Sequence, residues 1–409
     1  MKEVDLSFLS ELARNPEYVL TAQQQESLHN NQQLLKRANA IVILLGGKAG
    51  RLGECVVGTA FLEGMLQLLR VLHKEGISVQ VMLDQKSLDL FQEKSYQQAY
   101  WSEVSIQGLE APLDPRVILS LPGYADADAH LLVLDFHGAQ DGMPYCIYKQ
   151  TGHGSVTILG NLFRMGMRNY SQRGPEQRYT AFLTDLFALP ETMLTRSTVQ
   201  PYLRLAVEDQ LQIQELQHIY PLDPTAITII CFFQSVVLAK CYELWDDVMQ
   251  LLCEQVAREQ PGQKLEFVLA CGPDDNLPDG FKQADMADWL QDFTGVANNA
   301  QVRIYRTNTL RDLAMLTSRA SLALSDDTGP GHIAGALKIP VIIPFLPGNI
   351  YAKEIWSSTL WHHGVTLDPN PYSNQQIEAA IIWGRTDIID SIPPTRLYQE
   401  ASRYLPAKH

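Results

Sequence analysis

The sequence has few cysteines, and their spacing does not fit a metal site or a disulfide framework. Six cysteines are spread over 409 residues, and no two of them form a C-x-x-C pair. Structural zinc sites and small disulfide-stabilised domains both need closely paired spacings. We therefore expect free thiols that behave as small apolar side chains, and no zinc site.

Long apolar runs are also missing. The longest candidates, 40–45 and 340–346, have the length of strands, whereas a membrane helix needs about 20 apolar residues. The first residues, Met-Lys-Glu-Val-Asp, carry acids where a secretory signal has a basic and then an apolar segment. We expect a cytoplasmic protein with at most peripheral membrane contact.

Positive charge is scarce. The chain has 32 Lys and Arg against 46 Asp and Glu, a net charge of −14, and no Lys/Arg cluster. Such a charge opposes non-specific binding to nucleic acids and broad attraction to an anionic bilayer. We expect no nucleic-acid partner.

The length exceeds what a single hydrophobic core usually holds. We expect an N-terminal helical extension (1–38), two α/β domains (39–205 and 206–385) and a C-terminal segment (386–409) that crosses back to the first domain. The extension reads as two amphipathic helices. It packs on the first domain or forms a subunit contact in a homo-oligomer; both alternatives are open.

The most informative stretch is 321–347. Ser321–Leu324 and Pro340–Phe345 read as buried strands, and His332–Leu337 reads as a short helix of small residues. The polar loop 325–331 therefore leads onto a helix N-terminus, where free N–H groups and the helix dipole suit a phosphate or diphosphate. Glycines let the backbone approach such a ligand closely. The alternative is an ordinary turn with an N-capping Asp or Thr.

The whole string supports the first interpretation. The pattern D-T-G-P-x-H-I-A-x-A-L, followed by x-x-P-V-I, resembles the donor-binding signature of glycosyltransferase family 9, the ADP-heptose:lipopolysaccharide heptosyltransferases. The resemblance covers about 39–350. It implies an α/β protein of the GT-B type, in which two Rossmann-like domains with parallel sheets face each other across a central cleft.

The resemblance assigns the donor site to the second domain. It implies that Asp327 contacts the donor sugar and that His332 lies beside the diphosphate. Thr328 and the backbone N–H groups at Gly329 to Gly331, a segment that includes Pro330, then stabilise the charge on the diphosphate.

Two further residues of the second domain match the family's pattern. Lys240 takes the place of the lysine expected to meet the diphosphate, although the family's His-Pro-Gly turn before it is missing. The alternative for Lys240 is a solvent-facing side chain. Asp275 resembles the acid of the G-G-P-x-E loop, which can hold ribose hydroxyls.

The first domain supplies the acceptor side. The glycine-rich loop 46–54 follows a buried strand but is neither G-x-G-x-x-G nor a P-loop. It resembles the family's first loop, in which L-G-D precedes a long helix. The resemblance implies that Gly53 lies near the acceptor and that Glu54, in place of the family's aspartate, is the general base; the alternative for Glu54 is a helix-N-terminal acid.

His137 stands where the family often has Gln, as an acceptor contact or another base; the alternative is a loop histidine bonded to backbone. Asp126 and Asp128 form a D-x-D sequence, but they precede a strand instead of following one. We read them as a turn and expect no metal.

The resemblance implies inverting transfer of a sugar, with heptose favoured, from a nucleotide-diphosphate donor to a hydroxyl of a glycan, glycolipid or protein. No cofactor is expected beyond the co-substrate, for which ADP-heptose is favoured. Two alternatives remain. One is a different nucleotide-sugar donor, and the other is a degenerate, non-catalytic binding or assembly subunit.

Overall fold

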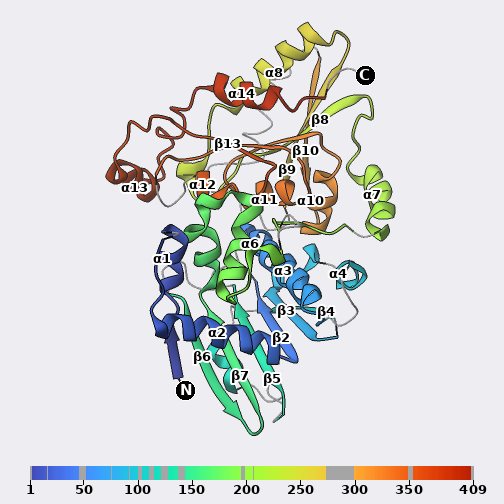
Figure 1. The fold of residues 1–409 in the computed structure, drawn as a ribbon. Helices are drawn as coiled ribbons and strands as arrows, with labels where there is room; N and C mark the ends of the chain where they lie inside the picture. The colour runs from blue at the N-terminus through green and yellow to red at the C-terminus, as the bar shows by residue number, and fades with distance from the viewer. Residues whose placement is uncertain are drawn as a thin grey trace. The chain divides into compact units, whose positions relative to one another are not determined.

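The chain forms two compact units, 1–206 and 207–409. In this computed structural model the described residues are 2–15, 17–45, 52–74, 76–91, 93–99, 104–109, 115–120, 128–136, 143–194, 199–205, 207–272, 299–348 and 353–406. Figure 1 labels the helices and strands of both units.

The first unit is built on a seven-stranded sheet with the order β1-β6-β7-β5-β2-β3-β4. Its strands are β1 (Lys2–Asp5), β2 (Ala40–Leu44), β3 (Ser78–Asp84), β4 (Val104–Leu109), β5 (His130–Asp135), β6 (Tyr145–Thr151) and β7 (Gly154–Gly160). The neighbours from β7 to β4 pair in parallel, whereas β6 pairs antiparallel with both β7 and β1. The central parallel strands β2, β5 and β7 are almost entirely buried, as expected for the interior of a parallel sheet, whereas the edge strand β4 is mostly half-buried or exposed.

The helices of the first unit include α1 (Phe8–Arg14), α2 (Ala22–Arg37), α3 (Leu52–Val71), α4 (Glu93–Ala99), α5 (Leu162–Arg164) and α6 (Pro175–Leu186). Shorter turns are η1 (Gln85–Leu90), η2 (Pro115–Ser120), η3 (Met165–Asn169), η4 (Ser171–Arg173) and η5 (Glu191–Met193). The apolar run 117–121 reads as a strand in the sequence, but this prediction is wrong, because 115–120 form the 3-10 turn η2. So short an apolar run does not distinguish a strand from a turn.

The N-terminal extension is not only helical, since it begins with the strand β1. This strand extends the sheet by pairing with β6, and α1 and α2 both contact α6. Thr21 caps α2 in a capping box with Gln24, which explains why the helix starts at Ala22. The extension thus packs on the first unit, the first of the two expected alternatives.

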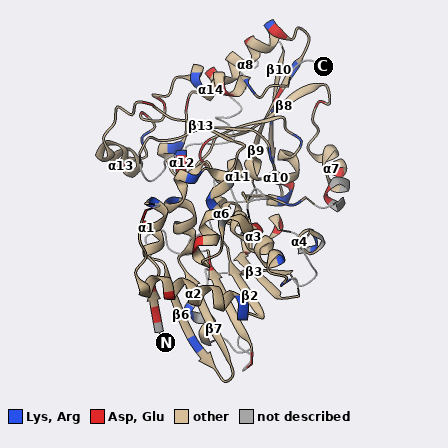
Figure 2. Ribbon diagram, viewed as in Figure 1, with Lys and Arg blue, Asp and Glu red and all other residues tan. Residues whose placement is uncertain are grey.

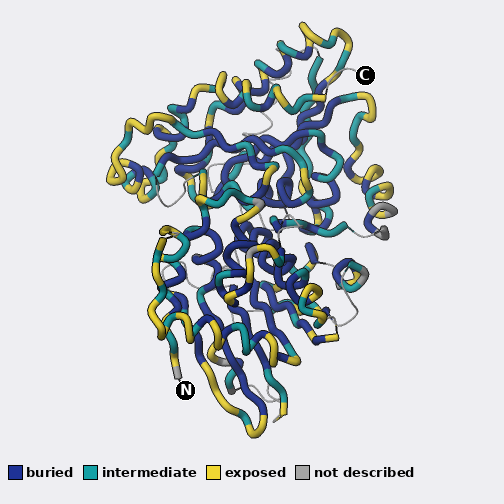
Figure 3. Tube along the Cα trace, viewed as in Figure 1, coloured by how far each residue is buried: buried dark blue, intermediate teal, exposed yellow. Residues whose placement is uncertain are grey.

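Helix α3 forms the centre of the first unit. Within the described residues it is the one helix that is long and apolar enough to cross a membrane, and 89% of its most apolar stretch is buried inside the protein. Figure 3 shows α3 and the central strands as buried, whereas the turn between β6 and β7 is exposed. A core helix of a globular unit has this character.

The second unit contains a six-stranded, fully parallel sheet with the order β10-β9-β8-β11-β12-β13. The strands are β8 (Ala226–Phe232), β9 (Lys264–Cys271), β10 (Ala300–Arg306), β11 (Leu322–Ser325), β12 (Val341–Pro344) and β13 (His362–Val365). Counted from β8, this is the 3-2-1-4-5-6 order of a doubly wound, Rossmann-type sheet. The chain therefore reverses its direction of strand addition between β8 and β11.

The helices of the second unit are α7 (Val207–Ile219), η6 (Leu238–Lys240), α8 (Trp245–Glu259), α10 (Leu310–Thr317), α11 (Gly329–Ala336), α12 (Lys353–Trp356), α13 (Asn374–Trp383) and α14 (Pro394–Ser402). The expectation that the last segment crosses back to the first domain is wrong. Helix α14 contacts α8, β12 and β13, and its Leu397 and Ala401 are part of the second unit's core. Burial of these two apolar side chains keeps the segment on its own unit.

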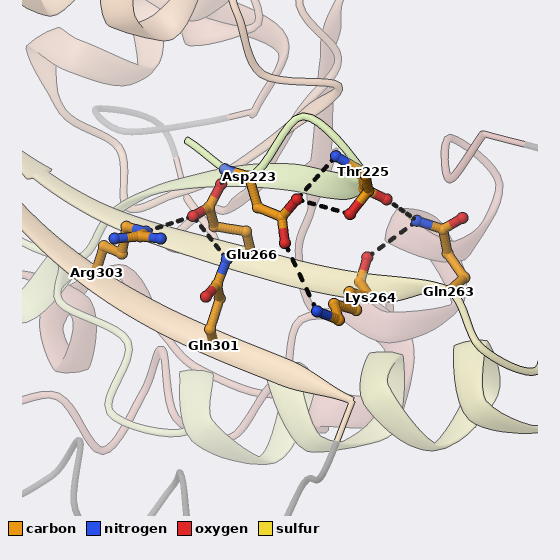
Figure 4. A network of polar contacts seen from close by, with 7 residues as sticks. All are labelled: Asp223, Thr225, Gln263, Lys264, Glu266, Gln301 and Arg303. Atoms are coloured by element: carbon orange, nitrogen blue, oxygen red, sulfur yellow. Dashed lines mark hydrogen bonds and ion pairs between the residues drawn. The ribbon is translucent and has the colours of Figure 1, made fainter. Parts of the chain in front are cut away.

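The amino end of the second sheet holds a paired polar network, shown in Figure 4. Glu266 on β9 is fully buried and accepts hydrogen bonds from the backbone N–H of Asp223 (2.9 Å), from Gln301 Nε2 (2.9 Å) and from Arg303 Nε (2.5 Å). Asp223 in turn accepts from the backbone N–H and the hydroxyl of Thr225. These contacts connect the loop before β8 to β9 and β10.

Candidate active site

The sheet order of the second unit places the ends of β8 and β11 side by side. Ser325, the last residue of β11, pairs with Phe232, the last residue of β8. In open α/β sheets, ligands bind outside the carboxyl ends of the strands, at the point where the strand order reverses. The loops that follow these two strands carry Lys240 and Asp327, so the topology itself brings the two predicted residues together.

Lys240 lies against the predicted turn. Its Nζ is 2.6 Å from Asp327 Oδ2 and 3.4 Å from the backbone oxygen of the same residue. The Nζ also lies 5.7 Å from the ring centroid of Trp356 on α12, in a cation–π arrangement. Lys240 is only 8% exposed, which excludes the solvent-facing alternative.

The helix N-terminus has the predicted form. Thr328 is the N-cap residue of α11, Gly329 is the first helical residue, and Pro330 in the first turn needs no hydrogen-bond partner for its nitrogen. The Thr328 side chain makes no capping hydrogen bond, so an ordinary capped turn does not account for it. Gly331 allows close packing on β11, since a Cβ there would lie 2.5 Å from Ser325 Oγ.

Asp326 holds the two loops together. It is fully buried, and its Oδ1 accepts hydrogen bonds from the backbone N–H of Tyr242 (3.2 Å) and from Trp245 Nε1 (2.9 Å). Burial raises the pKa of Asp326 to about 8, against the lowering effect of these two hydrogen bonds. Its Oδ2 has no hydrogen-bond partner within the described part of the chain.

His332 lies beside Asp327 in the first turn of α11. Its Nε2 is 3.8 Å from Asp327 Oδ1, and its ring centroid is 6.0 Å from that of Trp356. Burial, followed by the positive charge of Lys240, lowers the pKa of His332 to about 3, so that the ring is neutral at neutral pH. The Nδ1 atom is buried and has no hydrogen-bond partner among the described residues.

The remaining predicted residues lie elsewhere. Gly53 and Glu54 belong to the first turn of α3 in the first unit, where Glu54 is 5% exposed. That position agrees with either interpretation of Glu54, as a base or as a helix-N-terminal acid. His137 and Asp275 lie outside the described residues.

The predicted residues do not line the polar hollow of about 620 Å³ that the second unit also contains. That hollow lies where β12 and β13 end, and α14 borders it. Its lining residues include Thr366, which follows β13, and Arg396 and Arg403 from α14 and its C-terminal end. We assign the site by the contacts of Lys240 and Asp327, because chemistry depends on which groups meet and not on the size of a hollow.

Among the described residues, no group of three or more His, Cys, Asp or Glu side chains could hold a metal ion. Of the D-x-D sequence, Asp128 is described and exposed, and Asp126 lies outside the described residues. Figure 2 shows Lys and Arg distributed over both units and interspersed with Asp and Glu.

Three residues of the site were missed in the sequence. Asp326 had a signal, because two consecutive acids follow the strand, yet only the second matches the family's pattern. Trp356 and His362 had no such signal in the sequence. Both lie beyond the residues that resemble the family, and only the folded chain brings them into contact with α11.

Comparison with known proteins supports a glycosyltransferase. The family model described as glycosyltransferase family 9 (heptosyltransferase) matches residues 146–349, about half of the chain. A glycosyl transferase family 9 structure from Veillonella parvula DSM 2008 is 15% identical, with a TM-score of 0.56 over 90% of this chain and 97% of that chain. The E. coli ADP-heptose lps heptosyltransferase II is 12% identical, with a TM-score of 0.48 over 90% and 98% of the two chains.

No curated protein sequence matches the chain. The structural similarity extends over both units, each with a Rossmann-like sheet, as in the GT-B fold. Lys240 and the turn at Asp327 lie inside the matched residues. The chain belongs to glycosyltransferase family 9 and is a glycosyltransferase.

Proposed function

We propose that the chain transfers a sugar from a nucleotide-diphosphate donor to an acceptor hydroxyl, with inversion at the anomeric carbon. Heptose is the favoured sugar and ADP-heptose the favoured donor, because the matching family model is that of heptosyltransferases. The observation that carries the proposal is the position of Lys240 Nζ, 2.6 Å from Asp327 Oδ2, beside the N-terminus of α11.

The donor diphosphate would bind at this turn. The backbone N–H groups at the start of α11 and the positive end of its dipole favour an anion, and the Lys240 ammonium, which is paired with Asp327, adds further N–H donors. Asp327 holds Lys240 in place through the ion pair, and Asp326 fixes the loop that follows β8 through Tyr242 and Trp245. The cation is thus positioned before the donor arrives, which lowers the ordering cost of binding.

The chemical step is a direct displacement. Glu54 would remove the proton from the acceptor hydroxyl while its oxygen attacks the anomeric carbon. The bond from that carbon to the diphosphate oxygen breaks, and the nucleotide diphosphate leaves with the bonding electron pair. Lys240 and the turn would stabilise the charge that grows on the leaving group. We propose that these groups do the work that a divalent metal does in other transferases.

The acceptor would be a hydroxyl of a glycan, glycolipid or protein. We propose a cytoplasmic enzyme with at most peripheral contact with the inner membrane, where a lipid-linked acceptor would be found. His137, Asp275 and Gly53 keep their predicted roles as proposals.

The test is a donor panel assayed for acceptor-dependent release of nucleotide diphosphate, with the unchanged protein and Glu54→Gln. We expect turnover with ADP-heptose, and a loss of at least about 100-fold in Glu54→Gln with unchanged donor affinity, since a general base acts on the reaction and not on donor binding. Conversion of Glu63, on the same helix, serves as the matched control. Glu63 accepts two hydrogen bonds from Arg204. Glu63→Gln should therefore lower the melting temperature, while the rate of turnover changes far less than in Glu54→Gln.

Absence of turnover with every donor, together with retained ADP binding, would instead support the non-catalytic alternative. That alternative rests on the missing His-Pro-Gly turn and on the Glu54 side chain, which replaces the aspartate of the family.

A further inference from the structure

A second buried histidine contacts the first turn of α11 from β13. His362 Nε2 lies 3.3 Å from the backbone oxygen of Gly331. Its ring meets that of His332 edge to face, with 5.2 Å between the centroids. His362 is 6% exposed and lies beyond residue 349, where the match to the family model ends.

The neighbours of His362 determine which ring nitrogen carries the proton. The backbone N–H of Thr359 points at Nδ1 from 3.2 Å, and a backbone N–H can only donate. Nδ1 therefore accepts, and the neutral ring carries its hydrogen on Nε2. Burial, followed by the nearby His332, lowers the pKa of His362 to about 3, so the ring is neutral at neutral pH. Nε2–H thus donates to the carbonyl of Gly331.

The helix leaves space for this ring. A Cβ built on Gly335, one turn after Gly331, would lie 2.4 Å from His362 Nε2 and 2.9 Å from Thr359 Oγ1. The ring can therefore approach the backbone of α11 only because Gly335 has no side chain. The same contact explains why position 335 of this helix is a glycine.

We propose that His362 is a positioning residue for the diphosphate-binding turn and acts through the carbonyl of Gly331. The inference rests on the function proposed for that turn. The segment Gly329 to Gly331 has no polar side chain of its own that could anchor it. A hydrogen bond from β13 holds its backbone N–H groups in one orientation, and donors held in place bind an anion more tightly than donors that must first be ordered.

The test compares ADP binding by isothermal titration calorimetry in the unchanged 409-residue chain and three variants. His362→Phe keeps a flat ring but removes the donor, and His362→Gln keeps a side-chain N–H. His363→Phe is the matched control. His363 is the next residue on the same strand, but its Nδ1 lies 2.9 Å from Tyr404 Oη and its ring stacks on Tyr404 with 3.9 Å between the centroids.

We expect ADP to bind about tenfold more weakly to His362→Phe, the usual size of one lost hydrogen bond, with partial recovery in His362→Gln and no change in His363→Phe. In steady-state assays the KM for the donor should rise about tenfold in His362→Phe, while kcat changes less than about twofold, because the turn holds the donor before and during the reaction.

Gly335→Ala provides an independent perturbation, since the added methyl group would displace the ring of His362. It should weaken ADP binding as His362→Phe does, and thermal melting of every variant identifies any that fails to fold. If the unchanged protein binds ADP and His362→Phe binds it equally tightly, the inference is overturned while the proposed function stands. If the unchanged protein binds none of ADP, UDP, GDP and CDP, the proposed function fails and the inference with it.

Discussion

The second unit carries two clusters of buried charge at opposite ends of its sheet, and they differ in how completely their polar atoms are paired. At the amino end, both oxygens of Glu266 accept hydrogen bonds, one from backbone and one from two side chains. At the carboxyl end, Asp326 Oδ2 and His332 Nδ1 have no hydrogen-bond partner among the described residues. Glu266 and Asp326 are both fully buried, so burial does not explain the difference.

We interpret the fully paired cluster around Glu266 as one that stabilises the fold, and the incompletely paired cluster at the carboxyl end as part of the candidate site. Buried polar atoms are nearly always paired, because an unpaired one costs about 1–3 kcal/mol. The cluster around Glu266 follows that rule and connects a loop to two strands. The cluster of Asp326, Asp327 and His332 does not follow that rule. It lies at the carboxyl ends of the strands, where open α/β sheets bind ligands, and the pKa values of Asp326 and His332 are shifted. Each variant below changes one of the two clusters.

The largest expected effect is that of Lys240→Ala on turnover. Loss of the cation beside the diphosphate should lower kcat about 10²–10³-fold, as removal of a donor that stabilises developing charge does elsewhere. Release of nucleotide diphosphate measures it. Lys264→Ala is the control, because Lys264 is exposed at the amino end, 3.9 Å from Asp223 Oδ2. Equal turnover in the two variants would remove Lys240 from the mechanism.

Glu266→Ala should act on stability instead. It leaves the backbone N–H of Asp223 and the guanidinium of Arg303 without their carboxylate. We expect unfolding to become easier by about 2 kcal/mol, less than for a fully buried pair because Arg303 is partly exposed. Urea unfolding measures it, and calorimetry should show unchanged ADP affinity. A parallel loss of ADP affinity would mean that the two ends of the sheet are not independent.

Asp326→Asn should change how stability depends on pH. The folded state raises the pKa of this carboxyl from 3.8 to about 8, so between these values the folded protein holds a proton that the unfolded chain releases. Stability of the unchanged protein should therefore fall as the pH rises through this window, whereas the amide that replaces the carboxyl in the variant does not titrate. Melting temperatures at pH 5 and pH 8 measure it. A difference between the two proteins that stays constant with pH would contradict the raised pKa.

The smallest effect is expected at acid pH. His332 and His362 have pKa values lowered from 6.5 to about 3, so the unfolded chain takes up protons first as the pH falls. The stability that the two neutral rings give the folded state is complete above about pH 6.5 and is lost as the pH falls towards 3. His362→Gln should flatten the fall in melting temperature between pH 6.5 and pH 4. An identical pH profile would show that His362 does not titrate in this way.

Much of the fold could be predicted from local patterns. Apolar and alternating patterns predict strands at 40–45, 78–83, 130–134 and 226–233 and a helix at 374–383. Helix α13 has the predicted bounds, and β2, β3, β5 and β8 differ from the predicted strands by no more than one residue at either end. The hairpin of β6 and β7 was missed, although Gly152 in its turn has a φ of 57°, a conformation that favours glycine. The second half of β6 is polar and exposed, so the apolar pattern that marks a strand is interrupted just before the turn.

The sequence by itself determined the local form of the turn at 327–331, because a Pro in the first turn and flanking glycines act on residues next to them in the chain. Only the tertiary structure decided which groups meet there. Lys240 lies 87 residues before Asp327 and reaches it because β8 and β11 are neighbours in the sheet. His362 lies 31 residues beyond Gly331 and reaches it because β13 brings its ring against a helix with no side chain at Gly335. Local preferences act over a few residues, whereas the order of parallel strands depends on how the whole core packs.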